Sequence, residues 1–224
     1  MKKIFISVLF ILTLIQCATK PEIIRTYIPF TNETVTSATN NIAIIKINGI
    51  EIHIKYLNKI ELQKLAEKNN PYLDSNEAPL LTTFKITIYN NRDTKIEFEP
   101  KNAILLDGLG NQFSSLTYDM FKELYPSTVY KEYQYSFIFN RYYMEEHYTD
   151  DYYKRGKAGK TLFKGGKIYP KVHVTGILAF PRVSAKAREV TLVLPDIKFY
   201  NKNKEIVDTK EIEIKFKQKL VRTK

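Results

Sequence analysis

Hydrophobic side chains recur at every second position through much of this chain, and this spacing limits its possible folds more than any other feature. Residues 50–56 show it most clearly, because Ile50, Ile52 and Ile54 alternate with charged or polar side chains. Successive side chains of a β-strand point to opposite faces, so the spacing predicts a strand with one buried face. We expect about nine strands, which begin at residue 42 and include 50–56, 84–88, 95–99, 103–106, 172–180, 189–194, 197–200 and 211–216.

Short polar segments separate most of these strands and place them at hairpin spacing. Residues 90–93 and 201–204 are examples, since both are rich in asparagine and charged side chains. Many short strands joined by such turns are typical of antiparallel sheets that pack face to face. We therefore predict a mainly β protein, an antiparallel β-sandwich that spans residues 41–224 and carries one to three short helices.

Two segments have helical signals. Asn58 is a good N-cap, and Glu61 three residues later completes a capping box. Residues 69–71, Asn-Asn-Pro, end that helix. A second short helix is expected over 117–125, directly before Pro126.

The chain has 224 residues and a single cysteine, Cys17. An internal disulfide and a paired-cysteine metal site each need two cysteines, so this chain can form neither. Aromatic residues make up 13% of the chain, which is enough to build a core. Burial and backbone pairing must therefore provide the stability.

The first 17 residues have the organisation of a secretory signal. Lys2 and Lys3 are followed by an apolar stretch over residues 4–15 that only Ser7 and Thr13 interrupt. A membrane-spanning helix needs about 20 apolar residues, so this stretch is too short to remain as one. We expect an exported protein with a signal peptide at 1–16.

The end of this signal resembles the lipobox of bacterial lipoproteins. Leu14 stands three positions before Cys17, as in that family, whereas Gln16 departs from the small residue usual before the cysteine. The resemblance implies lipidation of Cys17, with a diacylglycerol and an N-acyl chain such as palmitate, and no other cofactor. It implies a membrane-anchored lipoprotein of the cell envelope, on the outer membrane or the periplasmic face of the cell membrane. The alternative is a soluble secreted protein.

Residues 17–40 are rich in Thr, Asn, Pro and Ser and show no sustained period. We interpret them as a polar tether that lifts the domain off the membrane. The alternative is an irregular first strand near residues 23–30.

Two further motifs resemble immunoglobulin-like domains of small bacterial lipoproteins of unassigned function. Residues 105–113 follow an aliphatic-Asp-x-x-Gly-x-x-aromatic pattern, and residues 165–181 run from Gly-Gly to Gly-x-Leu-x-Phe-Pro. The resemblance covers residues 78–218 and implies an immunoglobulin-like sandwich. Residues 114–165 would then be a helical, tyrosine-rich insertion.

The insertion is unusually rich in tyrosine. Residues 130–153 hold eight of the 16 tyrosines in the chain. These rings either pack onto the sandwich or form an interface for a glycan or protein, because tyrosine combines an apolar ring with a hydroxyl that can stay wet. The interface candidates are Tyr142, Tyr143, Tyr152 and Tyr153.

The positive charge is concentrated at the end of the insertion and directly after it. Residues 152–188 contain ten basic and no acidic residues, in a chain of net charge +11. Four glycines between 154 and 167 indicate a flexible loop. The segment is either a solvated loop that keeps the protein soluble or a contact with an anionic surface, such as anionic lipid, lipopolysaccharide or cell-wall polymer. The candidates for anion contact are Lys154, Arg155, Lys157, Lys160, Lys164, Lys167 and Lys171.

No catalytic or metal-binding motif is recognisable. Residues 159–161, Gly-Lys-Thr, lack the first glycine of a P-loop, because position 154 is a lysine. Asp107 and Asn111 fit a hairpin turn better than a calcium loop. Acidic residues around His147 leave an envelope hydrolase as a weaker alternative, and the exported location argues against nucleic acid.

The sequence thus favours a non-enzymatic, lipid-anchored envelope protein that acts as an interaction or structural module, with contact to anionic envelope surfaces. The alternative is an accessory subunit of an envelope protein complex, which would use the tyrosine-rich insertion to bind its partner.

Overall fold

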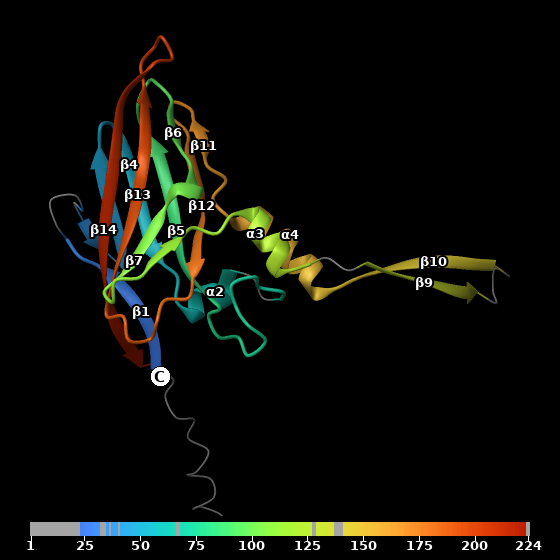
Figure 1. Cartoon of the computed structure of the whole chain (residues 1–224). Coiled ribbons are helices and arrows are strands. Elements are labelled where there is room, and N and C mark those ends of the chain that lie inside the picture. The colour runs from blue at the N-terminus through green and yellow to red at the C-terminus, as the bar shows by residue number, and fades with distance from the viewer. Residues whose placement is uncertain are drawn as a thin grey trace, which may run out of the picture.

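The computed structural model describes residues 23–31, 35, 37–39, 41–65, 68–126, 129–136 and 141–222 (Figure 1). The expected signal peptide at 1–16 and Cys17 lie outside the described residues. The fold is a β-sandwich of two antiparallel sheets, with 51% strand and 17% helix. The mainly β class expected from the two-residue period is confirmed.

The larger sheet has seven strands and contains both the first and the last strand of the chain. Its main order is β1-β14-β13-β6-β11, and β7 and β8 extend it from β13. All of its neighbouring strands are antiparallel. The bounds are β1 Ile23–Pro29, β6 Ile96–Phe98, β7 Ile104–Asp107, β8 Gln112–Ser114, β11 Gly166–Ile168, β13 Glu189–Tyr200 and β14 Ile206–Arg222.

The smaller sheet has five strands in the order β12-β5-β4-β3-β2, again antiparallel throughout. Its bounds are β2 Ser37–Thr39, β3 Ile42–Ile47, β4 Ile50–Tyr56, β5 Leu81–Asn90 and β12 His173–Pro181. In β4, buried and half-buried residues alternate along the whole strand. The alternation expected for residues 50–56 is therefore confirmed.

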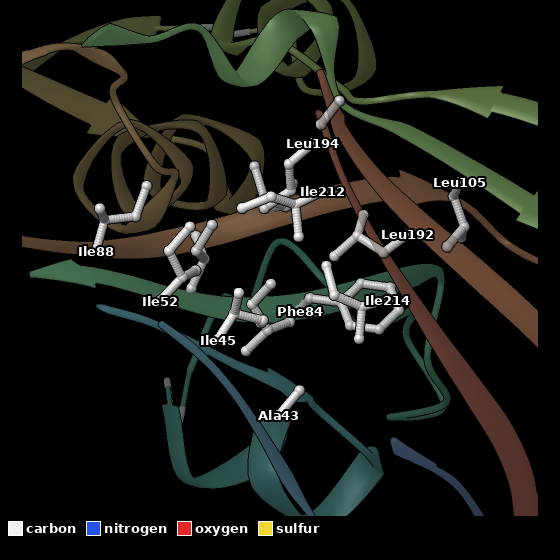
Figure 2. Close-up of a cluster of buried hydrophobic side chains, with 14 of the residues drawn as sticks. Ala43, Ile45, Ile52, Phe84, Ile88, Leu105, Leu192, Leu194, Ile212 and Ile214 are labelled. Atoms are coloured by element: carbon white, nitrogen blue, oxygen red, sulfur yellow. The ribbon is translucent and has the colours of Figure 1, made fainter. Parts of the chain in front are cut away.

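The two sheets enclose one large apolar core. Figure 2 shows side chains of the smaller sheet, such as Ile52 and Phe84, facing those of the larger sheet, such as Leu192 and Ile214. All four are fully buried. Burying a side chain of this size contributes about 1.5–3 kcal/mol, so this core is the main source of stability in a domain whose described part holds no disulfide.

A second, smaller apolar cluster lies on the outer face of the smaller sheet. Helices α2 (Lys59–Leu65), α3 (Tyr118–Leu124) and α4 (Asp150–Thr161) each contribute a buried residue to it, namely Leu62, Phe121 and Ala158. Ile177 and Ala179 of β12 join them, whereas the alternate residues of that strand face the main core. The sandwich is thus covered on one side by helices.

The capping box predicted at the start of α2 is present. The Asn58 side chain accepts a hydrogen bond from the Glu61 amide at 3.1 Å, and the Glu61 carboxylate accepts one from the Asn58 amide at 3.0 Å. The second expected helix is α3, whose N-cap is Thr117. The predicted turn at Asp107 is also confirmed, because its carboxylate accepts hydrogen bonds from the Leu109 and Asn111 amides.

The expected tether at 17–40 needs correction, because part of it is a strand. Residues 23–29 form β1, which pairs along its whole length with the end of β14. The alternative, a first strand near residues 23–30, is therefore the one that the structure bears out. Its partner lies about 190 residues later, which only the tertiary structure can provide.

The two strands expected at 189–194 and 197–200 are one strand. β13 runs from Glu189 to Tyr200, with a shift in register between Leu194 and Ile197. Asp196 adopts a positive φ of 56° at this bulge. A bulge inserts an unpaired residue and reverses which face the following side chains occupy, and this reversal looks like a break between strands.

Candidate interaction site

The insertion between β8 and β11 is built as two helices with a hairpin between them. Helix α3 leads into β9 (Val129–Ser136) and β10 (Arg141–Tyr148), and α4 follows at once. Thr149 begins α4, because its hydroxyl accepts a hydrogen bond from the Tyr152 amide at 3.4 Å. Helices α3 and α4 lie against each other and against the sandwich, so they fix the base of the hairpin.

The hairpin itself extends away from the sandwich (Figure 1). Its two strands pair with each other over eight positions, from Val129 opposite Tyr148 to Ser136 opposite Arg141. Within the described part of the chain they form a separate two-stranded sheet. Both outer edges therefore carry backbone groups without a strand partner, and such edges readily pair with another chain.

Three tyrosines gather where the hairpin meets α4. The ring centroids of Tyr148 and Tyr152 lie 4.4 Å apart, and those of Tyr152 and Tyr153 lie 5.6 Å apart. Tyr148 is 39% exposed and Tyr153 is 47% exposed. The Tyr148 hydroxyl donates a hydrogen bond to Glu146, which raises the pKa of Tyr148. These rings contact one another and belong to neither buried cluster.

The other two interface candidates are described only by their backbone. Tyr142 pairs with Tyr135 and Tyr143 with Gln134 in the hairpin. Their side chains lie outside the described residues, as does that of His147.

The basic segment is not a flexible loop, which corrects the expectation from its glycines. Lys154, Arg155, Lys157 and Lys160 lie on α4. Gly156 and Gly159 sit inside that helix, which the cap at Thr149 and the buried Ala158 hold in place. The Gly-Lys-Thr sequence at 159–161 is the end of this helix.

The structure divides the basic candidates between separate regions. On the helical side, Lys154 lies 3.9 Å from Asp151, and the Arg155 guanidinium lies over the Tyr152 ring. The Lys157 ammonium donates a hydrogen bond to the Lys68 carbonyl. Several of these charges are therefore already engaged by neighbouring groups.

The remaining candidates lie further along the chain. Lys167, in β11, is opposite Glu97, and Lys171 pairs with Asp93 at 2.9 Å beyond the end of that strand. Lys160 and Lys164 are exposed and have no ion pair with the residues that the structure describes. The seven residues thus form no single basic patch.

A cleft of about 580 Å³ separates α4 from the sandwich. Its floor is apolar and includes Phe163 and Ile177, while Lys101 and Lys164 are exposed at its rim. A Cβ atom at Gly159 would lie 2.9 Å from the Tyr118 ring, so glycine there lets α3 and α4 pack closely beside the cleft. No local pattern predicts this cleft, because its walls come from four separate segments of the chain.

Neither a metal site nor a membrane span is found in the described part of the chain. No three His, Cys, Asp or Glu side chains there are placed to hold a metal ion together. None of the described helices is long and apolar enough to cross a bilayer.

The chain was compared with protein-family models, curated proteins and solved structures, and no significant match was found. A functional proposal therefore depends on the geometry and chemistry of the described residues.

Proposed function

We propose that this protein is a lipid-anchored, non-enzymatic interaction module of the bacterial cell envelope, which binds a partner protein through the hairpin β9–β10. The projecting hairpin is the single observation that carries the proposal. A two-stranded hairpin is only marginally stable by itself. Here, two packed helices hold its base, and none of the other described strands pairs with its edges, which could take a strand of another chain.

The tyrosines support a protein partner. Tyrosine is enriched at protein interfaces, because it gives a large contact area at a low entropic cost. The exposed rings of Tyr148 and Tyr153 lie at the base of the hairpin, beside the end of β10.

The location is part of the same proposal. The signal at 1–16 and the lipobox-like end at Cys17 support export and a lipid anchor. Only residues 18–22 separate Cys17 from β1, so the sandwich would lie close to the bilayer. We further propose that the sandwich is of the immunoglobulin-like type, for which the motifs at 105–113 and 165–181 are the support.

The test is crosslinking in intact cells, followed by affinity purification. Replacing Tyr142 and Tyr143 together by alanine should abolish the crosslinked partner. The double variant should unfold at the same temperature as the parent, because the hairpin packs on no other sheet in the described structure. Tyr169→Ala, at a ring that is 61% exposed outside the insertion, is the matched control and should retain the partner.

A second candidate is contact with an anionic envelope surface through residues 154–171. The exposed side chains of Lys160 and Lys164 favour it. If vesicles with anionic lipid bind the parent and the double variant Lys160→Gln/Lys164→Gln equally at low salt, this candidate is wrong.

A further inference from the structure

A small cavity of about 270 Å³ lies at the end of the sandwich where β1 begins. It collects basic side chains from three elements that are distant in sequence. Arg25 comes from β1, Lys59 from the first turn of α2, and Arg182 from the residue after β12. Among the residues that the structure describes, none of those lining the cavity is acidic. Cationic side chains around a cavity favour a negatively charged occupant.

Arg25 has hydrogen-bonding capacity that the fold does not use. Its Nε atom is buried and has no hydrogen-bond partner. A buried donor of a charged group that has no partner costs free energy, so such donors are uncommon in folded proteins. Arg182 is exposed at the mouth, and no ion pair joins it to the described residues.

Two tyrosines form a rigid wall of the same cavity. The rings of Tyr27 and Tyr56 meet edge to face at 5.0 Å, and the Tyr27 hydroxyl donates a hydrogen bond to the Ala187 carbonyl at 3.0 Å. Burial raises the pKa of Tyr56 to about 12, while Arg25 and Arg182 lower it. Tyr56 therefore keeps its proton at neutral pH and can donate a hydrogen bond to an anion.

Exposed apolar side chains surround this end of the sandwich. Ile23 is 59% exposed, and Leu220, which pairs with Arg25 in the sheet, is 63% exposed. A basic cavity within an apolar surface is the arrangement expected where a protein meets the headgroup region of a bilayer. The exposed apolar residues on the elements around the cavity are Ile23, Ile60, Leu80, Leu220 and Val221.

We infer that this cavity binds the phosphate of an anionic lipid headgroup. Arginine is suited to this, because its planar guanidinium donates two parallel hydrogen bonds to a phosphate. The volume of about 270 Å³ lies just below the roughly 300–1,000 Å³ of sites for larger ligands, which suits a small group such as a phosphate.

The position of the cavity near Cys17 favours a lipid headgroup over free phosphate, provided that Cys17 carries the proposed lipid anchor. Ile23 is six residues after Cys17, so a fully extended chain spans at most about 20 Å between them. A lipid on Cys17 would hold the cavity at the membrane surface, where anionic headgroups are concentrated. The cavity would then fix the orientation of the sandwich and leave the hairpin free for its partner.

The experiment uses a chain that starts at residue 17 and carries Cys17→Ala, so that no lipid is attached. All strands of both sheets lie between Ile23 and Arg222, so this chain retains every described element. Its partition onto vesicles of phosphatidylcholine with 30% phosphatidylglycerol, about the anionic fraction of many membranes, is compared with that onto phosphatidylcholine alone.

The double variant Arg25→Gln/Arg182→Gln should lose about tenfold or more in partition onto the anionic vesicles. The control Lys202→Gln/Lys204→Gln removes the same charge from exposed positions at the β13–β14 turn, the opposite end of the sheet from the cavity. It should keep the partition of the parent within about twofold. Far-UV circular dichroism and the unfolding temperature verify that both variants fold.

Equal losses in the two double variants would mean that net charge alone drives binding, which overturns the inference. A titration with inorganic phosphate separates the two sources of the anion. If phosphate binds through Arg25 and Arg182 but the anionic vesicles do not, the cavity serves a free anion and the lipid assignment is wrong. Failure of the anchor itself is recognised separately, by absence of lipid on wild-type Cys17.

Discussion

At the scale of single residues, Gly176 in β12 is a position where two backbone segments pack closely. The chain leaving α4 crosses this strand, and the Phe163 amide donates a hydrogen bond to the Ile177 carbonyl at 2.9 Å. A Cβ atom at position 176 would lie 2.4 Å from the Phe163 Cα atom. Backbone cannot move aside as a flexible side chain can, so only glycine allows this crossing.

Gly176→Ala should therefore destabilise the domain by about 1–3 kcal/mol, the usual cost of overpacking. Gly156→Ala is the matched control, because a Cβ there meets nothing within 4 Å and the position lies inside α4. That variant should gain about 0.5–1 kcal/mol from improved helix propensity. Urea unfolding followed by circular dichroism measures both, and equal stabilities would contradict the argument.

The capping box of α2 gives a second prediction at this scale. Asn58→Ala removes the acceptor for the Glu61 amide and should lower the free energy of unfolding by about 1 kcal/mol. Asn203→Ala, at an exposed turn position, should change it by less than about 0.5 kcal/mol. A loss of equal size in both variants would show that the cap is not responsible.

At the scale of elements, the three-residue strand β6 depends on Glu97. The carboxylate accepts a hydrogen bond from the Tyr200 hydroxyl at 2.8 Å and lies 3.4 Å from the Lys198 ammonium. It is also opposite Lys167 of β11. One acidic side chain thus joins three strands of the larger sheet.

This carboxylate makes stability depend on pH. The hydrogen bond from Tyr200 lowers the pKa of Glu97 below its usual value of 4.5, burial opposes the shift, and Lys198 adds to it. The pKa of Glu97 is thus lower in the folded protein than in the unfolded chain. At a pH above its unfolded value, the ionised carboxylate stabilises the fold. This stabilisation is lost as the pH falls through the pKa that Glu97 has in the folded protein. We expect thermal unfolding measured from pH 7 to pH 2 to show this loss from about pH 4.5 downward.

Glu97→Gln should remove that part of the pH dependence. The parent and variant should therefore differ most above pH 4.5 and converge in acid. Glu211→Gln, at an exposed position of β14, controls for the change in net charge. An identical acid profile for the parent and Glu97→Gln would refute this role.

Some helices and strands follow the local sequence pattern, and others do not. Residues 50–56 and 58–65 follow their local signals, because one face of β4 is buried and α2 has its own cap. The bulge at Asp196 and the helical path of 154–161 do not follow from local signals. In both cases, contacts with distant segments outweigh the local preference for a break or a loop.

At the scale of the whole molecule, the proposed lipid on Cys17 gives the most direct test. Two or more acyl chains hold a protein firmly on a membrane, at about 0.8 kcal/mol for each buried CH₂ group. Wild-type protein should partition into detergent and incorporate labelled palmitate, whereas Cys17→Ala should be soluble and unlabelled. Ser7→Ala, inside the expected signal, controls for an effect on export and should behave as wild type. If wild type and Cys17→Ala partition alike, the anchor is wrong.

Local patterns in the sequence predict the fold class, most strand positions and two of the three α-helices that the structure describes. These depend on periods and caps that span fewer than ten residues, so they can be read locally. Other features depend on contacts between distant segments. These are the pairing of β1 with β14, the separation of the basic residues into different regions, and the projecting hairpin. The cavity lined by Arg25, Lys59 and Arg182 is another. Those three side chains are separated by up to about 160 positions in the chain, and no local period relates residues that meet only because two sheets pack together.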